Sequence, residues 1–192
     1  MPTTEESTQS IGRSKASIDN GFSRVGRTMS SDDRVASWLH AAGGRAVATC
    51  DAIILLCREH HAPEAASLAR AVIQLAADMR WIASSQGPDR LAEFEKDAAG
   101  RDWGLLWSAP RLRERLASSG LSEADAARWV DEAGKLCAGH LAGGSAGLPW
   151  AHAFGGAGPV RVLAETVLAV TARAMDEAVK ALEARWPGYF TA

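Results

Sequence analysis

Apolar residues recur every three or four positions between residues 65 and 82, and this spacing sharply limits what the chain can fold into. The stripe alternates steps of three and four without a break: Ala65, Leu68, Val72, Leu75, Met79 and Ile82. Residues with this spacing share one side of a helix with 3.6 residues per turn, so the pattern predicts an amphipathic helix. Pro63 suits its first turn, and the segment 84–88 ends it.

A second stripe of the same period precedes the first. Its members are Val35, Leu39, Ala42, Ala46, Thr49, Ile53 and Leu56. Asp32 and Asp33 suit the positively polarised start of a helix, so we expect one long helix over about 31–59, bent at most at Gly43 and Gly44. The turn of residues 60–62 is so short that the two helices must form an antiparallel hairpin.

Helical patterns continue downstream. A helix is expected over about 89–99, with a kinked continuation to Trp107, and a short helix over 110–118 that Gly120 terminates. Ser122 with Asp125 three residues later is close to a capping box, which predicts a helix to about His140.

The last helix is expected from Pro159 until Trp186-Pro187-Gly188. Its stripe contains Val160, Leu163, Val167, Val170 and Ala174. Before it lies a glycine-rich loop over 143–158, longer than most connections in compact domains. No segment alternates with period two and β-branched enrichment, so the sequence predicts no sheet.

Residues 1–30 are rich in Ser, Thr, Gln and charge, with few large apolar residues, among them Ile11, Phe22 and Val25. Such a segment buries too little surface to offset its ordering entropy, so we expect a disordered tail, with a short recognition arm as the alternative. Residues 31–188 are then expected to form a single all-α domain, an antiparallel bundle of about five or six helices. Its expected core is the two hairpin helices, the helix after Ser122 and the last helix.

Charge and cysteine content bear on compartment and partners. The formal net charge of −2 gives no positive field to attract nucleic acid or an anionic membrane. The longest strongly apolar run, 52–57, is far shorter than the ~20 residues that cross a bilayer. Three cysteines, Cys50, Cys57 and Cys137, without a signal-like segment favour a reducing cytoplasmic setting. Cys50 and Cys57, seven residues apart on one helix, are expected as core residues.

Polar residues lie on the other side of the 65–82 helix. Arg70, Gln74 and Trp81 are spaced by four and seven residues, about opposite the apolar stripe. Because small and apolar residues flank them, this helix is expected to be buried between partners, with the Arg70 guanidinium in need of acceptors.

The 65–82 segment, following a tight turn, resembles the signature helix of a bacterial family of uncharacterised all-helical proteins. That domain of unknown function carries an Arg-x-x-x-Glu helix and, later, an aromatic residue followed by a histidine. Arg70 matches the arginine, Gln74 stands where the acid is usual, and Trp150 and His152 match the later element. The resemblance implies an all-helical fold and no established activity, and Gln74 weakens any acid–base role taken from the family.

The candidate ligand-binding residues are Arg70, Gln74, Trp81, Trp150 and His152. In the functional interpretation Arg70 anchors an anion, Gln74 orients it, and His152 on the glycine-rich loop binds it or transfers a proton. In the structural interpretation, which we favour, Arg70 binds carbonyl groups of the loop, since buried polar groups must be satisfied in either case.

Two function classes follow. The first is a non-catalytic binding or assembly protein that associates with itself or a protein partner through tryptophan-bearing faces. The second is a metal-independent ribonuclease resembling HEPN proteins, acting as a toxin or phage-defence factor, with Arg34 and His40 as its Arg…His element. Six residues correspond to about 240° around a helix, so these two do not share a face, and we favour the first class.

Metal and cofactor binding are not expected. Cys137 and His140 lie three residues apart, and His60 and His61 stand near Glu59 and Glu64, but neither cluster repeats. The glycine-rich loop lacks the Gly-x-x-x-x-Gly-Lys-Ser/Thr pattern that cradles phosphates.

Overall fold

The described part of the chain is all-helical. The structure, a computed structural model, describes residues 2–26, 29–30, 32–99, 109–138 and 159–191. These residues form seven helices and no strand, as the sequence predicts. The helices are α1 (Thr4–Val25), α2 (Arg34–Arg58), α3 (Ala62–Ile82), α4 (Gly87–Ala99), α6 (Ala109–Ser118), α7 (Glu123–Ala138) and α9 (Pro159–Arg185).

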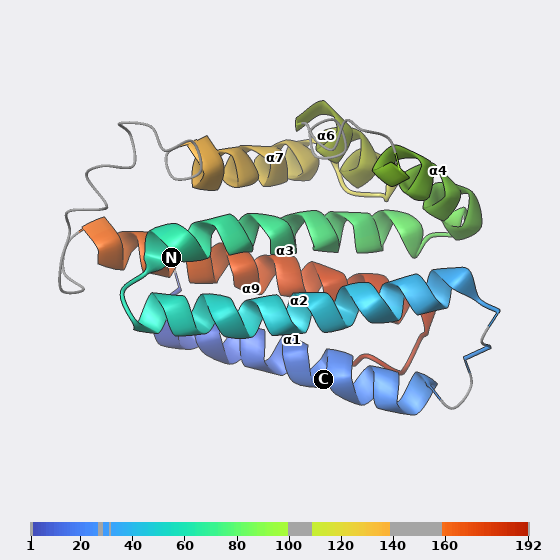
Figure 1. The fold of residues 1–192 in the computed structure, drawn as a ribbon, viewed down its shortest axis with the longest axis horizontal. Coiled ribbons are helices and arrows are strands. Elements are labelled where there is room, and N and C mark those ends of the chain that lie inside the picture. Colours follow the sequence, from blue (N-terminus) through green and yellow to red (C-terminus); the bar gives the residue numbers. More distant parts are fainter. Residues whose placement is uncertain (1, 27–28, 31, 100–108, 139–158, 192) are drawn as a thin grey trace.

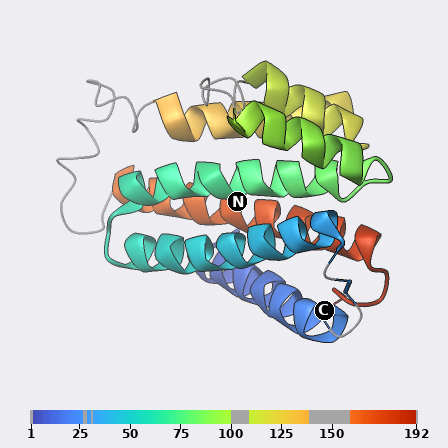
Figure 2. The same cartoon turned by 45° about the vertical axis from the view of Figure 1, so that its right-hand side comes forward.

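The helices are arranged in two parts that share α3. The long helices α1, α2, α3 and α9 form a four-helix bundle, in which α2 runs opposite to the other three (Figure 1). The shorter helices α4, α6 and α7 form an outer layer on the far side of α3 (Figure 2). Because α3 is covered on two sides, it is buried around most of its circumference, as its sequence predicts.

The predicted hairpin of α2 and α3 is confirmed. Asp33 caps α2, since its carboxylate accepts a hydrogen bond of 2.9 Å from the backbone N–H of Ala36. The helix continues through Gly43 and Gly44. His60 in the turn takes the left-handed conformation with φ of 66°. Ala65, Val72, Met79 and Ile82 of the predicted stripe are fully buried, and Leu68 and Leu75 are half-buried.

The expectation of a disordered tail over residues 1–30 is wrong, because α1 occupies most of this segment. Thr3 and Glu6 form a capping box: the Thr3 N–H donates to the Glu6 carboxylate at 2.7 Å, and the Glu6 N–H donates to the Thr3 hydroxyl at 3.2 Å. The buried residues of α1 have helical spacing, and they are Ser7, Ile11, Ser14, Ser17, Ile18, Gly21, Phe22 and Val25. Half of them are serine or glycine, which hides the stripe from a hydropathy pattern.

Small residues let α1 approach its neighbours closely. A Cβ atom at Gly21 would overlap the Phe190 ring, and a Cβ at Gly43 of α2 would lie 2.7 Å from the Phe22 ring. The Ser17 hydroxyl donates to the backbone carbonyl of Phe190, whose side chain is fully buried. From the sequence, the helix after Ser122 is expected to be the fourth core helix. In the structure α1 is the fourth helix of the bundle, and the helix after Ser122, α7, lies in the outer layer.

The remaining predicted helices are confirmed within the described residues. The Asp125 N–H donates to the Ser122 hydroxyl at 3.1 Å, and Gly120, with φ of 89°, follows α6. In α9 the stripe residues Leu163, Val167, Val170 and Ala174 are buried. The expected continuation to Trp107 and the glycine-rich loop over 143–158 lie outside the described residues.

Candidate functional site

The sequence-predicted residues of α3 lie along one side of the helix. Gln74 and Trp81 are buried, with exposed fractions of 8% and 5%, and Arg70 is half-buried. Among the described residues, neither Arg70 nor Gln74 makes a side-chain hydrogen bond or an ion pair. Trp150 and His152 lie outside the described residues, so the expected convergence of Arg70 and His152 stays a prediction.

Trp81 is part of a buried cluster that joins three helices. The guanidinium of Arg115 from α6 lies over the Trp81 ring, 4.7 Å from its centroid, in a cation–π contact. The same guanidinium donates to the Asp78 carboxylate of α3 at 2.7 Å. Phe94 of α4 closes the cluster, with its ring centroid 5.6 Å from the guanidinium carbon.

The ion pair of this cluster is removed from solvent. The side chains of Arg115 and Asp78 are 4% and 6% exposed. Burial raises the pKa of the Asp78 carboxyl to about 6, and the charge and hydrogen bond of Arg115 oppose that rise. The second terminal nitrogen of Arg115 has no hydrogen-bond partner among the described residues, although Asp97 lies 3.5 Å away.

A second arginine ties the same helices together at the surface. Arg90 of α4 donates to the backbone carbonyl of Trp81 at 2.8 Å and to that of Ser118 at 3.1 Å. It thereby satisfies carbonyl groups at the C-terminal ends of α3 and α6. A cavity of about 330 Å³ lies beside it, with Trp81, Arg90, Arg111 and Arg115 among its lining residues. Arg70 and Gln74 do not line this cavity.

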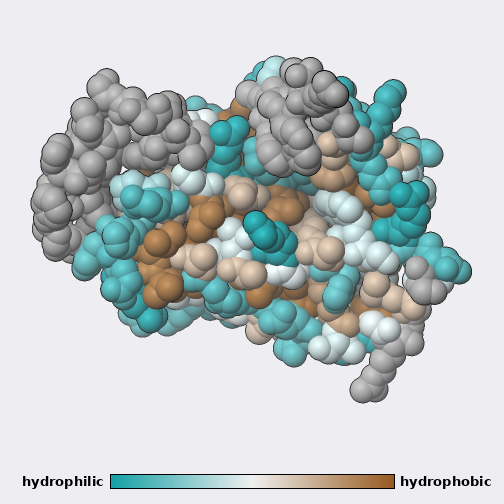
Figure 3. Space-filling view, in the orientation of Figure 1, coloured by the Kyte–Doolittle hydropathy of each residue, from teal (hydrophilic) through white to brown (hydrophobic). Residues whose placement is uncertain are grey.

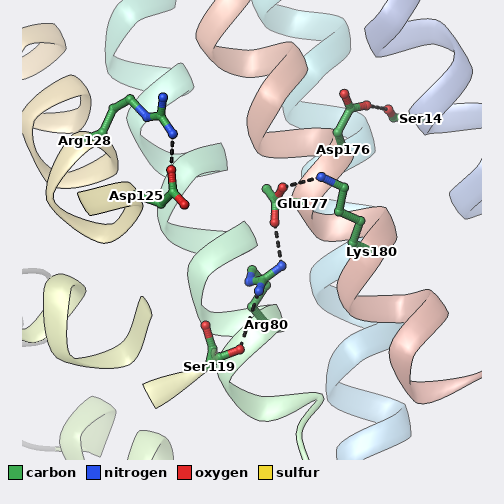
Figure 4. A network of polar contacts seen from close by, with 8 residues as sticks. All are labelled: Ser14, Arg80, Ser119, Asp125, Arg128, Asp176, Glu177 and Lys180. Carbon is green, nitrogen blue, oxygen red and sulfur yellow. Dashed lines mark hydrogen bonds and ion pairs between the residues drawn. The ribbon is translucent and has the colours of Figure 1, made fainter. Parts of the chain in front are cut away.

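A larger cleft of about 490 Å³ lies between α3, α7 and α9. At its base Arg80 donates to the Glu177 carboxylate at 2.5 Å, and Lys180 donates to the same carboxylate at 2.6 Å (Figure 4). Arg128 pairs with Asp125 on the α7 side of the cleft. The Nε atom of Arg80 is buried and has no partner among the described residues. Each of these three cations faces an acid, so the network ties α3 to α9 rather than presenting free positive charge.

Arg34 and His40 lie in different surroundings. Arg34 donates two hydrogen bonds to the Glu95 carboxylate of α4, at 2.7 and 2.8 Å. His40 packs edge-on against the Phe22 ring of α1, with 4.7 Å between ring centroids. This arrangement gives the ribonuclease interpretation no support within one copy of the chain, and that interpretation stays an untested prediction.

The cysteine and histidine clusters show no assembled metal site in the described part of the chain. Cys50 and Cys57 are free and buried, and burial raises the pKa of both thiols to about 12. A thiol that keeps its proton is a poor metal ligand and nucleophile. His61 lies 3.8 Å from Glu64 at the surface, and no group of three possible ligands converges among the described residues. The Cys137 and His140 side chains lie outside that part.

Sequence reasoning missed the charged residues that the structure buries. Asp78 and Arg80 stand in a helix that is apolar on two sides, and the argument that predicted partial burial of Arg70 applies to them equally. No sequence pattern indicates that Arg115 is buried. Its helix carries arginines at positions 111, 113 and 115, and their spacing alone does not distinguish the buried one.

Comparison with known proteins gives one match. The family model described as Family of unknown function (DUF5677) matches residues 36–145, more than half of the 192-residue chain and the stretch from α2 to α7. No curated protein and no solved structure matches the chain. The match agrees with the resemblance of the 65–82 helix to an uncharacterised family of all-helical proteins. The chain therefore belongs to DUF5677, a family of unknown function.

Proposed function

We propose that this protein is a non-catalytic helical assembly protein that self-associates through an apolar surface on α2 and α3. The observation that carries the proposal is Leu55, a large apolar side chain that is 56% exposed. Exposed apolar residues that gather on one face often mark an interaction site.

The residues around Leu55 extend this apolar character over both hairpin helices. The α2/α3 surface comprises Ala52, Leu55, Leu56, Leu68, Ala71 and Leu75, of which all but Leu55 are half-buried. The antiparallel hairpin brings the C-terminal half of α2 level with the N-terminal half of α3. Apolar side chains accordingly gather over these two helix ends (Figure 3).

Helix α2 has apolar area beyond what the bundle buries. By length and composition alone it could cross a membrane, and 33% of its most apolar 18-residue window is buried. One side of α2, however, packs in the bundle core. The solvent-facing part of the same helix carries two exposed charged residues, Arg45 and Asp51. A second copy of the hairpin offers apolar area of the same kind while leaving both charges at the rim, as in a two-fold symmetric interface.

The tryptophans of the described residues are engaged elsewhere. Trp38 packs on Phe94, with 5.3 Å between ring centroids, and Trp186 packs on Phe22 at 6.1 Å. Trp81 lies under Arg115, and Trp129 of α7 packs, partly buried, against the core. The proposed interface is therefore aliphatic rather than built on tryptophan-bearing faces.

Sedimentation equilibrium over a range of protein concentrations tests the proposal. We expect the wild type to exceed the monomer mass increasingly as concentration rises. The substitution Leu55→Glu puts a charge on the α2/α3 surface and should raise the dissociation constant by roughly 10-fold or more, about 1.4 kcal/mol or above. Circular dichroism checks that the variant stays folded.

Ala16→Glu is the matched control, because Ala16 is exposed on α1, away from the α2/α3 surface. It adds the same charge and should leave the association unchanged. A wild type that is monomeric at every concentration, or a Leu55→Glu variant that associates as the wild type does, would refute self-association through this surface.

A further inference from the structure

A groove of about 740 Å³ runs between the N-terminal half of α1 and α9, away from the α2/α3 surface. On the α9 side it is lined by Ala169, Val170 and Ala172, all at least nine-tenths buried in the fold. Ser7 and Ser10 line it from α1. Its volume falls within the range of small-molecule sites. Most of its lining surface is apolar, although eight of its twelve lining residues are polar or charged.

Ser7 is an unsatisfied polar group in this groove. Its residue is 1% exposed, and its hydroxyl has no hydrogen-bond partner among the described residues. The two other buried serines of α1 do have partners: Ser14 donates to Asp176 at 2.7 Å (Figure 4), and Ser17 donates to the Phe190 carbonyl. A buried hydroxyl without a partner costs about 1–3 kcal/mol, so a ligand that hydrogen-bonds Ser7 would recover free energy.

The charges at the rim select against an anionic ligand. The rim carries two arginines and three acids, namely Arg13, Arg173, Glu6, Glu132 and Asp176. Arg173 is already paired with Glu132 at 2.7 Å, and the Glu6 carboxylate holds the start of α1. The small excess of negative charge disfavours a carboxylate or phosphate, and neither sign dominates enough to bind a ligand by charge alone.

We propose that this groove binds a small, uncharged, apolar molecule carrying one hydrogen-bonding group, which Ser7 engages. The apolar part lies on Ala169, Val170 and Ala172, and the polar group meets the Ser7 hydroxyl. The site is independent of the self-association surface and shares no residue with it.

The test compares 2-naphthol with 2-methylnaphthalene, two probes of nearly equal size that differ in one hydroxyl group. Isothermal titration calorimetry or ligand-observed NMR gives both affinities. We expect the wild type to bind 2-naphthol roughly 10-fold more tightly, because a hydrogen bond to a buried group has about this value. Ser7→Ala should abolish the preference while retaining 2-methylnaphthalene binding.

Ser17→Ala is the matched control: it removes a buried α1 serine whose partner, the Phe190 carbonyl, lies outside the groove, and it should keep the preference for 2-naphthol. Ser10→Trp fills the groove from its half-exposed wall. It should weaken the binding of both probes at least 10-fold without a change in the bundle core. Leu55→Glu should leave both affinities intact, which separates this groove from the α2/α3 surface. The proposal is overturned if the wild type binds neither probe, or if Ser7→Ala and Ser10→Trp bind both as the wild type does.

Discussion

At the scale of single residues, the most consequential feature is the buried pair of Asp78 and Arg115. Removing charges from water is costly, and the pair is maintained by a short hydrogen bond and the Trp81 ring. At the Asp78 carboxyl burial outweighs the adjacent guanidinium, so its pKa rises above its usual value. The folded protein therefore holds a proton on Asp78 more tightly than the unfolded chain does.

This difference predicts a pH dependence of stability. Between pH of about 4 and 6 the folded state keeps the Asp78 proton, whereas the unfolded chain loses it, so the contribution of Asp78 to stability falls as pH rises. Urea unfolding of the wild type and of Asp78→Asn across this window measures the effect. The wild-type free energy of unfolding, minus that of the variant, should decrease through the window and level off above it.

Asp19→Asn, which removes an exposed carboxyl from α1, controls for the loss of one negative charge. A difference curve for Asp78→Asn that is flat or rises with pH would mean that burial does not govern this carboxyl.

At the scale of elements, α1 depends on the absence of side chains at selected positions. Gly21 lies against the Phe190 ring, and a Cβ atom added at Gly21 would lie only 2.8 Å from the ring Cγ. Phe190 has little freedom to retreat, because it is fully buried and its backbone N–H donates to the Glu183 carboxylate at 2.8 Å. Gly12, on the exposed side of the same helix, has no atom within 4 Å of such a Cβ.

Replacement by alanine should therefore have opposite effects on stability at these two glycines. Gly21→Ala should lower the free energy of unfolding by about 1–3 kcal/mol through overpacking. Gly12→Ala should raise it by about 0.5–1 kcal/mol, because alanine favours the helix over the unfolded chain. Urea unfolding of both variants gives the values. If Gly21→Ala proves as stable as Gly12→Ala, α1 does not dock against the C-terminal segment as described.

The same helix explains where prediction from sequence fails. The α2–α3 hairpin can be predicted because large apolar residues stand at helical spacing among its buried positions, namely Val35, Leu39, Ile53, Val72, Met79 and Ile82. In α1 the equivalent positions carry Ser7, Ser14, Ser17 and Gly21, whose burial depends on a close helix contact and on hydrogen bonds to α9 and the C-terminal segment. Hydropathy reports the size of an apolar group, not how closely two backbones approach, so the pattern of α1 wrongly indicates disorder.

The candidate site can be predicted in part for a related reason. The periodicity of α3 predicts burial on the side away from the apolar stripe as well, and Gln74 and Trp81 on that side are buried. It does not predict that Arg115 packs on this side, because the tertiary fold determines which helix approaches it.

At the scale of the whole molecule, the two parts differ in how they are held. The bundle buries long apolar stripes, whereas the described residues of α6 and α7 contribute a short set of buried apolar side chains: Leu112, Leu116, Ala126 and Ala133. The outer layer rests mainly on α3, with ion pairs such as Arg34–Glu95 and Arg173–Glu132 at its margins. Exposed ion pairs add little stability.

We therefore expect the outer layer to open more readily than the bundle. In native-state hydrogen exchange, amides of α6 and α7 should exchange through openings of lower free energy than amides in the middle of α3 and α9. Mass spectrometry of peptides from each helix measures the difference. Equal protection in both parts would show instead that the molecule unfolds as one cooperative unit.

The packing of α9 along α3 has a consequence for any fragment cut at the limits of the family match. The matched residues 36–145 stop before α9 begins and start after α1 ends. A fragment cut at those limits would expose the side of α3 that α9 covers and would leave Arg80 without Glu177. We therefore expect that a fragment able to fold on its own has to retain α1 and α9 in addition to the matched residues.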